Sequence, residues 1–281
     1  MIKINKVYVS FVLMLLFSAN AHSHEPTLTI VYDDEKTIYT RSELLTHPDL
    51  EEITIDYAPV YKGKKIVFSA FKVANIFEDE KIPKDALIQY WASDGYSAPL
   101  EKEYLLNRKK DKSIAYIAIE DPQKKWPPLK GRPMSAGPFY LVWFNPKLSH
   151  IPNKAWPYWI ESFEVKGVLE AEYPGIMPDK SLSRHHQVRK GMQLYVKHCF
   201  SCHTINHSGA PKKGPDLNIP MNPTEYFKGE TLKRLIRQPT AVRDWPGLAM
   251  SGFSEDDLSD GDIEDIIAYL KHMGGRKVSF K

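Results

Sequence analysis

The stretch Cys199-Phe200-Ser201-Cys202-His203 has the form C-x-x-C-H and contains both cysteines of the 281-residue chain. On one helical turn, two thiols three residues apart can each form a thioether with a vinyl group of the same porphyrin, while the next residue presents an imidazole to the iron. The pattern predicts one covalently attached haem c with His203 as an axial ligand.

Two other chemistries use the same residue types. A redox-active C-x-x-C belongs near a β-α-β pattern, whereas the residues around Cys199 are typical of helix, loop and helix. A zinc site could use His203 and His207, but Cys202 directly precedes His203 and leaves no interval in which a finger could fold. Haem attachment is the favoured interpretation.

Haem c attachment predicts export. The first residues have the three parts of a signal peptide, namely a positive start, an apolar run and an A-x-A cleavage site: Lys3 and Lys6, Val7–Phe17, and Ala19-Asn20-Ala21. A retained membrane anchor is the alternative, although the run is short for a bilayer. No cysteine stands directly after the apolar run, at the position where a lipid would be attached, which argues against a lipid-anchored precursor. We expect a signal peptide at residues 1–21 and a soluble periplasmic protein that begins near His22.

Charge and composition narrow the classes of function. Loss of Lys3 and Lys6 with the signal leaves 36 Lys and Arg residues against 35 Asp and Glu, which gives no electrostatic reason to bind nucleic acid. The mature chain of about 260 residues suits two domains. Because haem would use both cysteines, each domain needs its own apolar core, and a content of 42% hydrophobic residues makes this feasible.

The chain changes character once. Periodicity is lost between residues 171 and 186, which include Pro174, Gly175 and Pro178. We therefore expect an α+β domain at 22–170, a linker at 171–186 and an all-α domain at 187–281.

Three helices are predicted in the C-terminal part, at Val188–His198, Thr231–Arg237 and about Asp260–Met273. Ser259 and Asp262 form a capping-box variant at the start of the last helix, and Gly274-Gly275 ends it. Its apolar positions recur at helical spacing and should face a core or the porphyrin: Ile263, Ile266, Ile267 and Leu270.

Residues Gln187 to Met273 resemble the class I cytochrome c family. Gly191 and Tyr195 match the glycine and aromatic residue at which the first and last helices of that family cross, with Tyr269 opposite. Gly214-Pro215-Asp216-Leu217 resembles the family's G-P-x-L loop. The resemblance implies that the Pro215 carbonyl accepts a hydrogen bond from His203 and orients its ring.

The sixth iron ligand implied by the resemblance is Met250, in the loop before the last helix. The family commonly has proline directly after this methionine, and Ser251 stands there instead. The other sulfur or imidazole candidates are Met192, Met221, Met273 and His207, and a core role for Met250 is the alternative. A histidine and methionine pair fills both axial positions and raises the potential, which favours single-electron transfer over chemistry at the iron.

Charge is uneven around the predicted distal loop. Basic residues precede the loop and acidic residues follow it: Lys228, Lys233, Arg234, Arg237 and Arg243, then Glu255, Asp256, Asp257, Asp260, Asp262, Glu264 and Asp265. This asymmetry could orient a periplasmic or membrane redox partner, and a solvated face is the plainer alternative.

The N-terminal part alternates short strands and short helical pieces, which predicts an α+β domain with a mixed or antiparallel sheet. Strands are expected at Leu28–Tyr32, Glu52–Asp56, Ile66–Phe68, Leu87–Ala92, Ser113–Ile119, Phe139–Phe144 and Ile160–Val165, and helical pieces at Arg41–Thr46, Phe71–Phe77 and Glu101–Leu106.

Three stretches of this part resemble the sulfite-oxidase-like molybdopterin-binding fold over about Leu28 to Gly167. They are Ala92–Leu100, which contains D-G-Y, Gly137–Trp143, and Trp156–Val165. In that family a cysteine thiolate binds molybdenum, and this domain has no cysteine. The resemblance therefore implies a retained scaffold that has lost metal chemistry and serves to bind a small molecule or to dock a partner.

A copper site is a further hypothesis. Cleavage after Ala21 would create the terminus His22-Ser23-His24, whose amine and imidazole nitrogens can surround Cu(II) in a square plane. Solvated terminal histidines are the alternative.

Three classes of function follow. The first is a periplasmic electron carrier, a monohaem cytochrome c fused to a binding or docking domain. The second is an oxidoreductase whose N-terminal domain oxidises a small substrate and passes electrons to the haem. The third is a copper-binding or assembly factor that uses haem structurally. The sequence favours a carrier over an enzyme.

Overall fold

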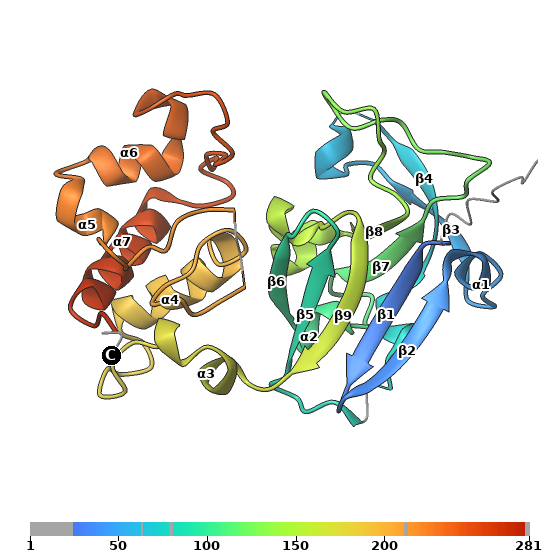
Figure 1. Cartoon of the computed structure of the whole chain (residues 1–281), viewed down its shortest axis with the longest axis horizontal. Helices are drawn as coiled ribbons and strands as arrows, with labels where there is room; N and C mark the ends of the chain where they lie inside the picture. Colours follow the sequence, from blue (N-terminus) through green and yellow to red (C-terminus); the bar gives the residue numbers. More distant parts are fainter. Residues whose placement is uncertain (1–24, 63, 79–80, 211–212, 279–281) are drawn as a thin grey trace, which may run out of the picture.

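The computed structural model describes residues 25–62, 64–78, 81–210 and 213–278. The signal peptide expected at 1–21 and the terminus His22-Ser23-His24 lie outside the described residues. Figure 1 shows two bodies side by side, one built on β-sheets and one built from helices, joined by the short helix α3 (Leu169–Glu172). No helix within the described ranges is long and apolar enough to cross a membrane.

A five-stranded mixed sheet forms one half of the N-terminal body. Its strands lie in the order β2 (Glu35–Thr40), β1 (Thr27–Tyr32), β9 (Ile160–Lys166), β5 (Leu87–Ala92) and β6 (Ser97–Glu101). Strands β1 and β9 run parallel, and the other neighbours are antiparallel. The chain therefore returns at its end to the centre of the sheet, which brings the first and last segments of this body together.

A four-stranded antiparallel sheet forms the other half, in the order β3 (Glu51–Ile55), β4 (Ile66–Lys72), β7 (Ile114–Ile119) and β8 (Phe139–Phe144). All six residues of β7 and the first five of β8 are buried. Such strands read as continuous apolar runs because both of their faces are covered.

One aromatic-rich core joins the two sheets. Its largest fully buried side chains come from both sheets: Phe68, Phe71, Tyr90, Phe139, Tyr140, Trp143 and Phe163. The short helices α1 (Arg41–Leu45) and α2 (Lys102–Leu105) add Leu44 and Leu105 to this core. The aromatic residues of this region thus serve mainly as core.

Strands β2 and β6 were not predicted from the sequence, and both lie at the edges of the five-stranded sheet. Strand β2 is mostly exposed, and β6 carries Pro99, which suits an edge strand. Neither strand needs an apolar alternation, so the pattern that reveals half-buried strands is absent.

The prediction of a helical piece at Phe71–Phe77 was wrong in its first two residues. Strand β4 continues to Lys72 because Phe71 and Lys72 pair with Ile117 and Tyr116 of β7, and only Val73–Ile76 forms a 3₁₀ helix. Tertiary pairing here overrides the local pattern.

The C-terminal body contains α4 (Gln187–His198), α5 (Pro223–Tyr226), α6 (Thr231–Arg237) and α7 (Asp260–Gly274). The predicted helices match α4, α6 and α7 closely. Ser259 and Asp262 form the capping box of α7, and Gly275 is its C-cap, as expected. Ile263, Ile266 and Leu270 are buried in the helical core, and Ile267 packs partly against it.

Helices α4 and α7 cross in close contact. A Cβ atom on Gly191 would lie 2.0 Å from the backbone oxygen of Asp265, and the rings of Tyr195 and Tyr269 pack 5.5 Å apart. The glycine is therefore required by the approach of the two backbones, as the family resemblance implies.

Replacing Gly191 by alanine should destabilise the helical body by about 2 kcal/mol, because overpacking forces the two backbones apart. Gly261→Ala is the matched control. Gly261 also lies in α7, but its Cβ would meet nothing closer than 3.9 Å, so its replacement should be neutral or slightly stabilising. Denaturant titrations of the purified full chain followed by visible absorbance check the difference, and equal midpoints would contradict the prediction.

The segment expected as a linker packs firmly. Ile176 is fully buried in the helical core, and its carbonyl accepts a 2.6 Å hydrogen bond from the Tyr269 hydroxyl. Tyr173 packs edge-on against Phe200 and donates a 2.8 Å hydrogen bond to Gln89 of β5. This segment lacks long elements but contacts both bodies, so it fixes one against the other.

Candidate functional site

The C-x-x-C-H residues form a tight turn at the C-terminus of α4. The backbone N–H groups of Cys202 and His203 both donate to the Cys199 carbonyl, each at 3.0 Å. Cys199 and Cys202 are both unbridged and half-buried. The turn therefore places two free thiols and one imidazole within a single bonded unit.

The environment of Cys199 is unfavourable for dithiol redox chemistry. Burial raises the pKa of the Cys199 thiol to about 11, so the thiolate that such chemistry needs is scarce at neutral pH. Cys199 is also the C-cap of α4, where the negative end of the helix dipole further disfavours a thiolate. These features argue against a thioredoxin-like role for the pair.

The His203 ring is held on two sides. Its Nδ1 lies 2.8 Å from the Pro215 carbonyl, the contact implied by the G-P-x-L resemblance. Because a carbonyl can only accept, Nδ1 carries the proton and Nε2 is left with a lone pair for a metal. Burial lowers the pKa of His203, which keeps the ring neutral as a ligand must be.

Gly214 lies flat against this ring. A Cβ atom at Gly214 would come within 2.5 Å of His203 Cε1, so only glycine permits the observed ring position.

Gly214→Ala should displace the His203 ring and weaken its bond to Pro215. We expect a broadened visible spectrum and a melting temperature lower by several degrees, since the clash resembles overpacking worth about 1–3 kcal/mol. Gly229→Ala is a useful comparison because that glycine has open space around its Cβ, although its φ of +54° adds some strain. An unaltered spectrum in Gly214→Ala would contradict the positioning role.

Asp216 organises the loop that carries Pro215. Its carboxylate accepts hydrogen bonds from the backbone N–H groups of His207, Asn218 and Ile219 at 2.7–2.8 Å, and from the Thr204 hydroxyl at 2.8 Å. Burial opposes ionisation, but these donors outweigh it and lower the pKa of Asp216. Asp216 was not predicted as a site residue, although its place inside the G-P-x-L loop could have indicated this role.

Buried asparagines tie the same loop to α7. Asn218 Nδ2 donates to the Met273 carbonyl at 2.8 Å, and Asn222 Nδ2 donates to the Leu270 carbonyl at 2.8 Å. Met273 lies in the last turn of α7 and Leu270 lies just before that turn, so both asparagines hold the loop to the C-terminal end of this helix. Neither asparagine was predicted as a site residue, because nothing in their spacing indicates a bond to a carbonyl of α7.

The predicted distal loop lies beside the C-x-x-C-H turn. Phe253 packs edge-on against the His198 ring at 5.6 Å, directly before Cys199. Arg237 fixes the loop, since its guanidinium donates to the Phe253 and Leu258 carbonyls at 2.9 and 2.7 Å. Met250 lies in this loop and is half-buried. Its bond to iron stays a prediction.

The other candidate ligands have different surroundings. Met192 and Met273 belong to the buried helical core, whereas Met221 is 52% exposed. His207 has an exposed side chain in a left-handed turn. Within the described residues, no group of three or more His, Cys, Asp and Glu side chains is arranged to hold a metal ion, which gives no support to the zinc alternative.

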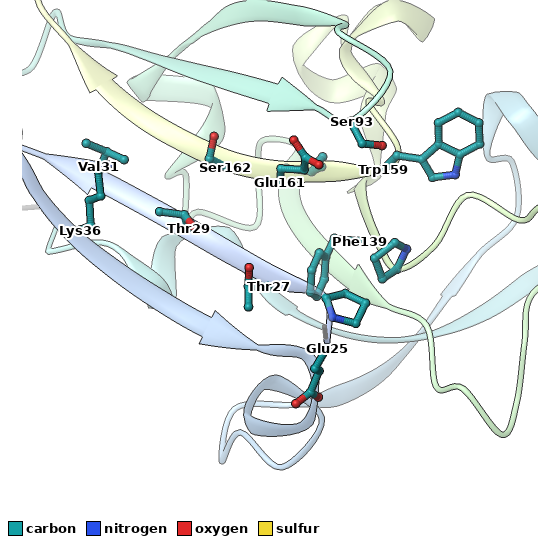
Figure 2. A pocket seen from close by; sticks show the side chains of 13 residues that line it. Glu25, Thr27, Thr29, Val31, Lys36, Ser93, Phe139, Trp159, Glu161 and Ser162 are labelled. Carbon is teal, nitrogen blue, oxygen red and sulfur yellow. The ribbon is translucent and has the colours of Figure 1, made fainter. Parts of the chain in front are cut away.

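The N-terminal body has a shallow pocket of about 490 Å³ on the outer face of the five-stranded sheet. Figure 2 shows Thr27 and Thr29 of β1 facing the space between β1 and β9, with Glu161 and Ser162 on the β9 side. Ser93 forms part of the wall, and its N–H donates to the Trp159 carbonyl at 3.0 Å. The stretch Ala92–Leu100, which contains D-G-Y, and Trp159 are thus adjacent in space.

A helical body that presents two free thiols and an oriented imidazole on one turn has the donor set of a haem-attaching electron-transfer domain. Residues 188–274 match the family model described as cytochrome c. The C-terminal domain is therefore a cytochrome c domain. This family membership implies covalent haem c. The two free thiols and the neutral His203 ring, which Gly214 leaves room for, fit that group.

Proposed function

We propose that the chain is a periplasmic carrier of single electrons, with one haem c bound through Cys199 and Cys202 and with His203 and Met250 as axial ligands. The observation that carries the proposal is the orientation of His203 by Pro215 and Gly214 on a turn with two free thiols. The chain has no third cysteine, which favours a single haem. Bound haem would supply a one-electron redox couple. Cys199 and Cys202 would attach the porphyrin, and Pro215 would orient the His203 ligand.

Periplasmic location is supported by the residues at 1–21, which have the parts of a signal peptide. A redox partner in the periplasm or at its membrane would donate or accept the electron. The acidic and basic segments on either side of the distal loop could orient this partner, although Arg237 and Lys233 pair with Asp260 within the domain and leave less charge for it.

The N-terminal domain is proposed to be a binding or docking module with a sulfite-oxidase-like fold that no longer carries molybdenum. Support comes from the absence of cysteine in this domain and from the composition of its pocket. Among the residues that the structure describes, Lys36 is the single basic side chain lining the pocket, against the carboxylates Glu25 and Glu161. A phosphate-bearing pterin would need more cations than this.

An oxidoreductase is the second candidate, because one residue of the pocket wall is the sequence neighbour of a residue that contacts the cytochrome domain. Ser93 lines the pocket, and its neighbour Asp94 forms a 3.1 Å ion pair with Lys213 of the helical body. A small substrate oxidised in this pocket would therefore lie near the haem site. This function requires a cofactor in the N-terminal domain.

Purification from a strain able to mature haem c tests these functions. For the carrier we expect one iron per chain, no molybdenum or pterin, a pigment that acidified organic solvent does not extract, and no rapid reaction of the reduced protein with carbon monoxide. Molybdenum in stoichiometric amount would favour the oxidoreductase. A colourless or extractable product would overturn the haem proposal.

A further inference from the structure

The sheet-containing domain contacts the cytochrome domain next to the C-x-x-C-H turn, through the bend between β5 and β6. Asp94 of this bend forms the ion pair with Lys213, which directly precedes Gly214 in the loop that orients His203. Both side chains of the pair are partly shielded from solvent, with exposed fractions of 23% for Asp94 and 36% for Lys213. The pair therefore holds the bend next to the haem-attachment residues.

Tyr96 follows in the same bend and contacts the turn itself. Its hydroxyl lies close to the side chain of Ser201, one of the two residues between the cysteines. Burial raises the pKa of Tyr96 to about 12, with the nearby Cys202 adding to the rise. The Tyr96 hydroxyl also donates a 3.4 Å hydrogen bond to the Lys154 carbonyl, which joins the bend to Lys154, a second residue that contacts the cytochrome domain.

Lys154 makes this second contact from the 3₁₀ helix Asn153–Ala155 of the same domain. Its ammonium group donates to the His198 carbonyl at 3.3 Å and lies 4.2 Å from the centroid of the Phe253 ring. These two partners belong to the end of α4 and to the predicted distal loop. A cation from one domain is thus held between the two segments that border the haem site of the other.

The charge of Lys154 acts on the residues of this site. Burial is the largest cause that lowers the pKa values of His198 and His203, and the Lys154 charge lowers both further. The same charge partly offsets the rise that burial causes in the pKa of Cys199. The charge of Lys154 therefore acts on both ends of the C-x-x-C-H turn, and protein around it weakens screening by water.

We propose that the N-terminal domain is an electrostatic part of the haem site, in which docking through Asp94 and Tyr96 holds the Lys154 ammonium beside the thioether turn and raises the reduction potential. The inference rests on the proposed attachment of haem at Cys199 and Cys202. Its physical basis is that the oxidised site carries one more positive charge than the reduced site, so a fixed neighbouring cation favours the reduced one. Lys154 is a positioning and tuning residue, distinct from the ligands.

Spectroelectrochemical titration of the full-length holoprotein tests this role. In Lys154→Met, which keeps the length of the side chain without its charge, we expect the equilibrium constant for reduction to fall about three- to tenfold, where tenfold corresponds to about 59 mV for one electron. Lys154→Arg should keep the potential close to that of the unchanged protein. Lys147→Met is the matched control, because Lys147 is an exposed lysine of the same domain, and it should shift the constant by less than about twofold.

A charge-reversal pair tests whether docking holds Lys154 in place. Asp94→Lys places two lysines together, so it should open the interface. Lys154→Met made in that background should then shift the potential much less than it does in the unchanged protein. In the background Asp94→Lys with Lys213→Asp, which keeps the net charge and restores an attractive pair, Lys154→Met should recover most of its effect. Lys154→Gln takes its place in these comparisons if Lys154→Met does not mature.

The proposal is overturned if Lys154→Met keeps the original potential, if Lys147→Met shifts it equally, or if Lys154→Met has the same effect in Asp94→Lys as in the unchanged protein. Failure of haem attachment is a separate result, which a haem stain of the denatured protein on a gel reports directly. A stained protein with an unchanged potential in Lys154→Met therefore refutes this inference alone.

Discussion

Replacing both Cys199 and Cys202 by alanine should give a protein that contains no covalent haem. The two thiols are the only sulfurs of the chain able to form thioethers, and His203 by itself supplies only a coordinate bond that acid breaks. We expect complete loss of the haem stain on a denaturing gel and loss of pigment after extraction with acidified organic solvent. Each single variant should retain one thioether and show a shifted visible band.

Ser201→Ala is the matched control for the double cysteine variant. Ser201 lies between the two cysteines and is 6% exposed, so its replacement perturbs the same turn without removing a thiol. It should retain the haem stain. Extraction-resistant pigment in the double cysteine variant would show that the attachment assigned to this turn is wrong.

Met250→Ala should open one axial position of the haem. The thioether of methionine favours reduced iron, so its loss should lower the potential and convert a low-spin spectrum into one with high-spin features. The reduced variant should bind carbon monoxide readily, with at least a hundredfold increase in apparent affinity if the unchanged protein is six-coordinate, equivalent to about 2.7 kcal/mol. Visible spectroscopy with carbon monoxide titration measures both effects.

Met221→Ala is the control, since Met221 is 52% exposed and shares the residue type. Its spectrum should be unchanged. If Met250→Ala also retains the original spectrum and does not bind carbon monoxide, then Met250 is a packing residue and another side chain completes the axial pair. Ser251, where proline is common in the family, is exposed, and Arg237 holds this loop through its bonds to the Phe253 and Leu258 carbonyls.

The local features of the haem site follow from short stretches of sequence. The family resemblance implied the contact between His203 and the Pro215 carbonyl, and the structure has it. The close approach of Gly214 to the same ring was not predicted. The start of α7 was predictable because Ser259 and Asp262 cap it through bonds within three residues, so spacing and residue type are enough to predict it.

The edge strands and the buried anchors of the site were less predictable. Strand β6 carries a proline and leaves little alternation, while Asn218 and Asn222 bond to carbonyls of α7 that lie 55 and 48 residues further along the chain. Polar residues at such positions look like ordinary loop residues in the sequence. Their role depends on a helix end brought to them by tertiary packing.

The sequence by itself predicted a haem-attachment turn of the form C-x-x-C-H in a small helical domain, because covalent attachment and helix ends depend on residues only a few positions apart. The tertiary structure alone decided that the other domain contacts this turn. Lys154 reaches the His198 carbonyl over 44 residues, and Asp94 reaches Lys213 over 119. Those contacts arise from how two separately packed cores meet, and no spacing along the chain encodes that meeting.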